Sequence, residues 1–439
     1  MRKGIETLLI GAALFLCAGQ VAWAQTAPDV RIGSTRTESR LVEVAVVDFS
    51  LTGSDTLGFG AMASKVINFD LGFSGFFKAV PQREFILEYD AKDRKNGTVD
   101  YDAWKTISSN FLVKGKIIPE DETKIAVEVV VYDLQRRQMD FGKRYTGPVS
   151  MYRQILHQFS DDFLYRYAGE TGVARSKMLF ISAVRGRKEL MVVDYDGDNP
   201  RQLTTERTLV LSPAWNHANK NLALFTTYRY RNPDLYVMDL TNMQRYPLST
   251  AVGLNSTGDW SPDGTRVAFA LSKQGNTDIY IVNADGRGLT RLTSERSAEL
   301  NPSWSPDGQK LAFTSDMGGT PQIYIMNSDG TGRERFSYTG RYCDGAAWSP
   351  KGDMIAYASL VYDNFDIVVQ QIRDRAAQII TEGYGKGNSE SPSWAPDGRH
   401  LAFSSTNSGN RQLYISGLTG GAPLPITNLP GGGSQPSWG

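Results

Sequence analysis

A tryptophan recurs at nearly constant spacing through the C-terminal half of the chain. The successive intervals are 45, 44, 44, 46 and 44 residues, for Trp215, Trp260, Trp304, Trp348, Trp394 and Trp438. Four short strands fit within such a period, and one repeat of this length is typical of one blade of a β-propeller. The spacing therefore predicts a ring of similar four-stranded sheets.

The residues inside one period support four strands. Most of the tryptophans are followed by a variant of Ser-Pro-Asp-Gly, in which Pro fixes φ, Asp bonds its own backbone and Gly takes the left-handed conformation. Residues 311–315 and 322–326 alternate as a second and a third strand, and Asp329-Gly330 predicts the hairpin turn that follows. A fourth, outer strand then leads to the next tryptophan.

The two ends of the repeat region predict the number of blades. Trp438 stands one residue before the last residue of the sequence, so its strand has no second, third or fourth strand after it. Residues 177–182, 189–194 and 201–204 match those three strands but have no tryptophan strand before them. Joining the ends predicts a six-bladed propeller over residues 177–439, closed by the C-terminal strand 434–439.

The first half of the chain has a different pattern. A buried strand is expected at 42–49, helices at 60–71 and 150–167, and a hairpin from 124–133 and 139–145. These elements predict an α+β N-terminal domain over residues 25–170, with a hinge at 169–176 before the all-β propeller.

Residues 1–24 have the features of a signal peptide. Arg2 and Lys3 are followed by the apolar run Leu8–Ala18 and by Ala22-Trp23-Ala24, so we expect cleavage after Ala24 and export. A lipoprotein anchored through Cys17 is an alternative, but Leu16 stands where a small residue is required. No transmembrane segment is expected in the mature chain.

Charge and cysteine content exclude some classes of function. Without residues 1–24 the chain has 45 basic (47 − 2) and 46 acidic (47 − 1) residues, so no overall field favours nucleic acid or an anionic membrane. Cys343 is then the single cysteine and is expected to be a small buried residue, not a disulfide partner or a catalytic thiol.

No motif indicates an enzyme, a metal or a cofactor. Histidines occur only at His157, His217 and His400, in unrelated positions, and no nucleophile elbow, phosphate loop or dinucleotide fingerprint is present. The stretch 194–199, Asp-Tyr-Asp-Gly-Asp-Asn, resembles the start of a calcium loop, but its glycine stands fourth instead of sixth. We therefore expect a hairpin turn there. The Ser-Pro-Asp-Gly aspartates are likewise expected to form turns: Asp263, Asp307 and Asp397.

Comparison between the repeats separates two faces of the ring. Turns between first and second and between third and fourth strands are nearly uniform, whereas loops at the other face diverge. Divergence is expected where a surface recognises an asymmetric partner. Basic residues of this face fall on the first two blades and acidic ones across the ring: Arg185, Arg187, Lys188, Arg229 and Arg231 against Asp344, Asp363, Asp366 and Glu390.

The repeats, the leader, Asp29-Val30-Arg31-Ile32, the strand Val-Ala-Val-Val-Asp-Phe and the helix before Gly-Phe-Phe-Lys together resemble the TolB family of the Tol-Pal cell-envelope system. The resemblance covers nearly the whole chain. It implies a periplasmic adaptor without catalysis, expected to act as a monomer, that supports outer-membrane integrity and envelope constriction during cell division.

The resemblance also implies two partners. The lipoprotein Pal would bind loops of the propeller that precede the tryptophan strands, through Leu254, Asn255, Glu299, Leu300, Asp344 and Glu390. The C-terminal domain of TolA would engage Asp29, Val30, Arg31 and Ile32, whose polar and apolar alternation suits strand addition. Two alternatives stay open: a metal-dependent hydrolase or lactonase-like propeller enzyme, and a structural scaffold that does not bind Pal.

Overall fold

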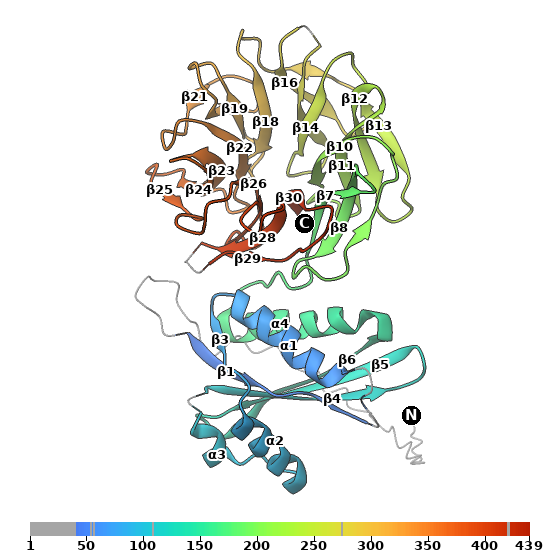
Figure 1. Cartoon of the computed structure of the whole chain (residues 1–439), viewed down its shortest axis with the longest axis vertical. Helices are drawn as coiled ribbons and strands as arrows, with labels where there is room; N and C mark the ends of the chain where they lie inside the picture. The colour runs from blue at the N-terminus through green and yellow to red at the C-terminus, as the bar shows by residue number, and fades with distance from the viewer. Residues whose placement is uncertain (1–40, 53–54, 56–57, 108, 274, 419–421) are drawn as a thin grey trace, which may run out of the picture.

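The computed structural model describes residues 41–439 except 53–54, 56–57, 108, 274 and 419–421. It contains an α+β domain followed by a six-bladed β-propeller, which confirms the predicted fold class (Figure 1). The predicted leader and the segment 29–32 lie outside the described residues.

The N-terminal domain is built on one sheet with the strand order β3-β1-β4-β5-β6, and β2 pairs with β4. Strand β1 is parallel to β3 and β4, while β4, β5 and β6 are antiparallel. The strands are β1 (Val42–Val46), β2 (Ser50–Leu51), β3 (Phe77–Ala79), β4 (Phe111–Pro119), β5 (Lys124–Asp133) and β6 (Gln138–Pro148). The helices are α1 (Phe59–Phe73), α2 (Glu84–Asn96), α3 (Tyr101–Lys105) and α4 (Tyr152–Ala168).

Alternation along β1 produces two cores, one on each face of this sheet. Val44 and Val46 join the core that α1 and α4 cover, whereas Ala45 belongs to the core that contains Ile86 of α2 and Trp104 of α3. Side chains of a strand point to opposite faces in turn, so one continuous apolar run serves both layers.

Each propeller blade is a four-stranded antiparallel sheet. Blade 1 comprises β10 (Val210–Trp215), β11 (Leu222–Tyr230), β12 (Asn232–Asp239) and β13 (Arg245–Ser249); blade 2 comprises β14 (Asn255–Trp260), β15 (Arg266–Leu271), β16 (Asp278–Asn283) and β17 (Thr290–Arg291); blade 3 comprises β18 (Glu299–Trp304), β19 (Lys310–Ser315), β20 (Gln322–Asn327) and β21 (Glu334–Arg335).

The remaining three blades complete the ring. Blade 4 comprises β22 (Cys343–Trp348), β23 (Met354–Leu360), β24 (Phe365–Gln371) and β25 (Ala377–Ile379); blade 5 comprises β26 (Ser389–Trp394), β27 (His400–Ser405), β28 (Gln412–Gly417) and β29 (Leu424–Pro425); blade 6 comprises β30 (Ser434–Trp438), β7 (Lys177–Val184), β8 (Arg187–Asp194) and β9 (Arg201–Gln202). Strand β30 thus pairs with β7, which lies far from it in the sequence.

The repeated tryptophans pack between neighbouring blades. Trp260 lies in a core with Leu224 and Leu235 of blade 1, and Trp304 lies in a core with Ile279 of blade 2. Burying a large aromatic side chain between two sheets stabilises their contact, so each period of the sequence supplies one interface between blades.

The N-terminal domain contacts the turns of blades 5 and 6. The ring of Phe73 in α1 stacks on His400 with the centroids 4.2 Å apart, and the Phe73 carbonyl oxygen lies 2.8 Å from His400 Nε2. Arg399, beside His400, pairs with Glu170 of the connection between the domains. The connection, which we expected to be a hinge, is thus bonded to the propeller turn that it passes.

A second group of polar contacts joins α1 and α4 to blade 6. His157 Nδ1 lies 2.9 Å from Asp70, whose carboxylate also accepts a hydrogen bond from the Tyr195 hydroxyl. Burial alone would lower the pKa of His157, but the hydrogen bond to Asp70 and the charges of Asp70 and Asp196 raise it. Arg153 pairs with Asp196, so the stretch that resembles a calcium loop is a hairpin turn used in domain contact.

Candidate functional site

The strands of each blade are antiparallel, so the connections between strands lie alternately at the two opposite faces of the ring. We call the end with the uniform turns the turn face; the N-terminal domain contacts it through Asp196 and Arg399. We call the other end the variable face. It carries the hairpins between second and third strands and the loops that lead from one blade to the next, such as 203–209, 250–254, 292–298, 336–342 and 380–388.

A bulge interrupts the first strand of every blade at the same place. The strand register shifts just before each tryptophan, and the residue three positions before the tryptophan has a positive φ between 51° and 69°. These residues are Ser212, Thr257, Asn301, Gly345, Ser391 and Gln435. A bulge adds an unpaired residue and can redirect its side chain, and five of these six residues carry a polar one.

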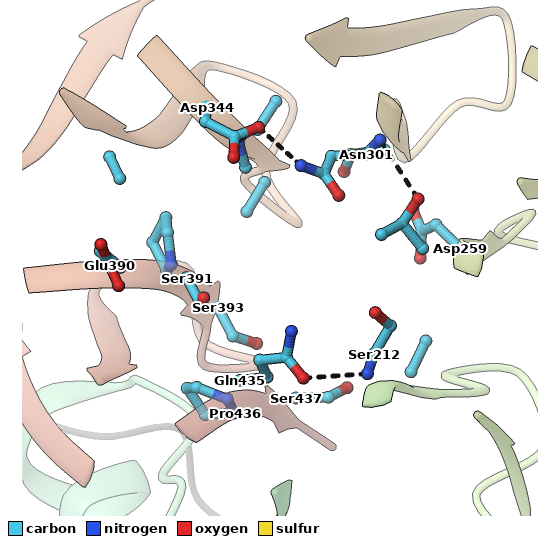
Figure 2. A pocket seen from close by; sticks show the side chains of 18 of the residues that line it. Ser212, Asp259, Asn301, Asp344, Glu390, Ser391, Ser393, Gln435, Pro436 and Ser437 are labelled. Atoms are coloured by element: carbon cyan, nitrogen blue, oxygen red, sulfur yellow. Dashed lines mark hydrogen bonds between the residues drawn. The ribbon is translucent and has the colours of Figure 1, made fainter. Parts of the chain in front are cut away.

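The bulge residues line the central cavity of the propeller, which has a volume of about 430 Å³. Figure 2 shows polar side chains from different first strands around this common space. Three carboxylates line the cavity, and no lysine or arginine is among its lining residues. The three are Asp259, Asp344 and Glu390.

These carboxylates have different partners. The Asp344 carboxylate accepts hydrogen bonds from Asn301 Nδ2 (2.6 Å), the Thr314 hydroxyl (2.8 Å) and the Gly345 N–H (2.7 Å). Glu390 pairs with Arg411. Asp259 accepts a hydrogen bond from the Trp304 N–H at 2.8 Å, and burial raises the pKa of its carboxyl to about 6.

In four of the six blades, the side chain of the residue before the tryptophan accepts a hydrogen bond from the neighbouring blade. Ser303, Ser393 and Ser437 each accept a hydrogen bond from the backbone N–H of the next tryptophan around the ring, at 2.9 to 3.0 Å. Asp259 occupies the same place in blade 2. These bonds fix the inner strands against one another, so the cavity has a rigid wall.

The structure separates the six predicted Pal-contacting residues into two groups. Asp344 and Glu390 line the central cavity, whereas the other four do not. The Asn255 side chain is buried and donates to the carbonyl oxygens of Ala251 and Gly253. Glu299 is buried as well and accepts a hydrogen bond from Ser315. Both side chains hold the loops of the variable face, while Leu254 and Leu300 are half-buried beside them.

Exposed apolar and aromatic side chains occur in several loops of the variable face. The loops and hairpins of blades 1, 3 and 4 present large side chains that are 46 to 83% exposed: Tyr230, Val252, Met317, Tyr338 and Tyr362. Exposed aromatic residues are typical of protein interaction surfaces. We did not predict these residues; their signal was an apolar or aromatic residue within a polar loop.

Comparison with known proteins agrees with this architecture. A family model described as the TolB beta propeller domain matches residues 165–439, and one described as the TolB amino-terminal domain matches residues 30–139. The chain belongs to the TolB family. This membership indicates that the chain is a component of the Tol-Pal system.

Individual TolB proteins are moderately similar in sequence. The Tol-Pal system protein TolB of Desulfosudis oleivorans is 31% identical over 273 residues, which are 62% of this chain and 61% of that protein. TolB of a Ruegeria species is 32% identical over 258 residues, 58% of this chain and 57% of that protein. These alignments thus span about three fifths of each relative. Their name designates a component of the Tol-Pal system.

One solved TolB structure resembles nearly the whole fold. The crystal structure of TolB from Acinetobacter baumannii has a TM-score of 0.77 and 24% sequence identity, and the match covers 91% of this chain and 96% of that chain. At this identity the likeness concerns the fold alone.

Two further observations concern membranes and metals. Among the described residues, no helix is both long enough and apolar enough to cross a membrane. Within the same part of the chain, no three or more His, Cys, Asp or Glu side chains are grouped so that they could hold a metal ion. The buried Cys343 is a free thiol, and its burial raises the pKa of the thiol.

Proposed function

We propose that the chain is a periplasmic adaptor of the Tol-Pal system that binds the lipoprotein Pal through the variable face of its propeller. The observation that carries this proposal is the contrast between the two faces. The turn face is uniform and partly covered by the N-terminal domain through Arg399 and Asp196. Among the residues that the structure describes, the domain's polar contacts with the propeller lie at the turn face, whereas the variable face combines diverse loops, exposed aromatic residues and a polar cavity.

The proposed contacts use a rigid surface. Leu254 and Leu300 provide half-buried apolar atoms beside the cavity, and Asp344 and Glu390 provide carboxylates at its wall. Asn255 and Glu299 contribute by fixing the loops, since their side chains are bonded inside the blades. A surface that is already ordered loses little conformational freedom on binding, which favours affinity.

We extend the proposal to TolA through the sequence of the N-terminal segment. Asp29, Val30, Arg31 and Ile32 alternate polar and apolar side chains, as a strand added to the edge of a sheet requires. In this proposal a signal peptide is removed after Ala24, so the segment lies close to the new N-terminus. The adaptor would then link two envelope proteins, one at each end of its chain, in support of outer-membrane integrity and of constriction during division.

A pull-down with the mature protein tests both contacts. Leu300→Arg places a charge among apolar atoms of the proposed surface, so we expect Pal binding to weaken about tenfold or more. The matched control is Leu289→Arg, since Leu289 is exposed in a turn-face hairpin; it should bind Pal like the wild type. Removal of residues 25–40 should abolish TolA binding and leave Pal binding intact. Absence of Pal from the wild-type sample would contradict the proposal.

A further inference from the structure

Six exposed cationic side chains gather on the variable face of blades 6 and 1. They come from the β7–β8 hairpin, the loop between β9 and β10, and the β11–β12 hairpin. We call them the basic sector: Arg185, Arg187, Lys188, Arg207, Arg229 and Arg231. Blades 6 and 1 are neighbours in the ring, so three separate segments contribute to one surface.

Contacts between the segments show that the sector is continuous. The Arg187 guanidinium donates a hydrogen bond to the carbonyl oxygen of Arg207, which connects the first hairpin to the loop. Arg229 lies 3.7 Å from the carboxylate of Glu206, which connects the second hairpin to the same loop. The Arg229 guanidinium also lies 5.6 Å from the ring centroid of Tyr230, itself 64% exposed.

The carboxylates beneath the sector are buried and already bonded. Glu189 accepts hydrogen bonds from the Thr204 hydroxyl and from the N–H groups of Glu206 and Arg207, at 2.6 to 3.0 Å. Glu206 is inaccessible and pairs with Arg245, which approaches from β13. Across the described part of the chain, Arg185, Lys188 and Arg231 have no carboxylate within ion-pair distance. The outer surface of the sector therefore carries positive charge that no described carboxylate pairs with at Arg185, Lys188 and Arg231.

Three of the five arginines in the basic sector occupy a backbone conformation that disfavours them. Arg185, Arg207 and Arg231 have φ of 53°, 57° and 73°, in the left-handed region where glycine or asparagine is the usual residue. Each stands in a hairpin or loop of the variable face. Residues in such conformations cluster at functional sites, so we take these three charges to serve a contact outside the fold.

The opposite side of the face indicates which kind of partner fits. Blade 4 and the loop after it carry Asp344, Asp363, Asp366 and Glu382, accompanied by Arg341 and Lys386. A uniformly anionic surface, such as a membrane, would be attracted at the basic sector but repelled at these four carboxylates. A protein that carries its acidic residues in one segment can place them over the basic sector alone.

We propose that the basic sector receives an acidic segment of the protein that binds the variable face, and so sets the orientation of that protein on the propeller. The inference rests on the proposed function, because it needs a protein partner at this face. Arginine suits the role, since its guanidinium forms paired hydrogen bonds with a carboxylate. The attraction acts before contact, so it accelerates association more than it slows dissociation.

The test is the association rate of the full mature chain with Pal, measured by surface plasmon resonance at low and at high salt. Arg185→Glu combined with Lys188→Glu reverses two charges whose side chains make no described hydrogen bond or ion pair. We expect about a tenfold slower association at low salt and convergence with the wild type at high salt. The control combines Lys220→Glu with Arg287→Glu, two exposed cations of the turn face, and should associate like the wild type.

The outcomes separate this inference from the proposed function. If the wild type binds Pal, Leu300→Arg does not, and the basic-sector variant associates normally at both salt concentrations, the inference is wrong while the proposed function stands. If the wild type does not bind Pal, the proposed function itself fails. Binding of the wild type to vesicles rich in anionic lipid, lost in the basic-sector variant while Pal association is unchanged, would also overturn the inference, because the partner would then be a membrane.

Discussion

Asp259 is the one acidic residue among the six that precede the repeated tryptophans. The other five are alanine or serine: Ala214, Ser303, Ala347, Ser393 and Ser437. Asp259 accepts the same bond from the next blade as the three serines do, so a hydroxyl would satisfy the Trp304 N–H equally well. The carboxylate brings a charge into a partly buried position, and its raised pKa of about 6 reflects that cost.

Replacement of Asp259 by serine should stabilise the propeller at neutral pH. The folded-state pKa of about 6 lies above the ordinary aspartate value of 3.8, so the folded protein binds a proton at Asp259 more readily, and the contribution of this group to wild-type stability falls as pH rises from about 4 to 6. In Asp259→Ser this slope should vanish, and the free energy of unfolding at pH 7 should rise by about 1 kcal/mol or more. Urea unfolding at several pH values measures both effects.

Asp263 provides a control in the same blade. Hydrogen bonds from the Ser261 hydroxyl and from the Thr265 N–H and hydroxyl lower the pKa of its carboxyl to about 2. Its stabilising contribution is therefore complete above pH 4 and is lost only as pH falls toward 2. Asp263→Ser should leave the slope between pH 4 and 6 unchanged. If it removes that slope and Asp259→Ser does not, the assignment of the titrating group is wrong.

Residue types in the sequence predicted some features of the site, but not the bulge residues that line the central cavity. The sequence predicted the places of the tryptophans and of the turn aspartates because both recur with the repeat. In the structure most of the tryptophans are buried and Asp263 accepts a hydrogen bond within its turn, as expected. The bulge residues are serine, threonine, asparagine, glycine and glutamine, so no residue type marks the position. Their left-handed conformation belongs to the bulge in each first strand, and the residue types at these positions do not reveal it.

At the scale of elements, β30 joins the two ends of the propeller. Trp438 is fully buried, its N–H bonds the Ser393 hydroxyl of blade 5, and its indole Nε1 donates to the Ser176 hydroxyl at 2.7 Å. Its core includes Phe73 of α1 and Val173 of the connection, so this tryptophan supports blade 6 and the N-terminal domain together.

Trp438→Ala should destabilise the protein by about 3–5 kcal/mol, as expected when a buried tryptophan is removed. Trp348 is only half-buried, so Trp348→Ala should cost clearly less. Chemical unfolding of the two variants, followed by far-UV circular dichroism, measures the difference. Equal losses for both variants would contradict the view that β30 holds the ring closed.

In the N-terminal domain, the sequence predicted helix α4 but not helix α2. Helix α4 was predicted because Ile155, Phe159 and Phe163 recur at helical spacing. Helix α2 was not predicted. Few of its residues are apolar, and a buried ion-pair group holds it to the sheet, where Lys114 of β4 pairs with Asp90 and Asp93. That group depends on side chains 20 or more residues apart, which no local periodicity reveals.

On the scale of the whole molecule, the two faces of the propeller differ in what they contact. The turn face of blades 5 and 6 holds the N-terminal domain through Tyr195, Arg399 and His400. The variable face, at the other end of every blade, is left for a partner. Sequence comparison between the repeats predicted that the faces differ, but the domain contact could not be predicted, because its hydrogen bonds join residues from 43 to 327 positions apart.

Amide hydrogen exchange with and without saturating Pal is the most direct test of whether Pal binds the variable face, because it reports on every loop of both faces in one measurement. We expect slower exchange of the variable-face segments in the presence of Pal, at residues 250–257, 295–301, 339–345 and 385–391. We expect no change in the turn-face segments 261–265, 305–309 and 349–353. Protection confined to the turn face, or exchange that Pal does not alter anywhere in the propeller, would contradict binding at the variable face.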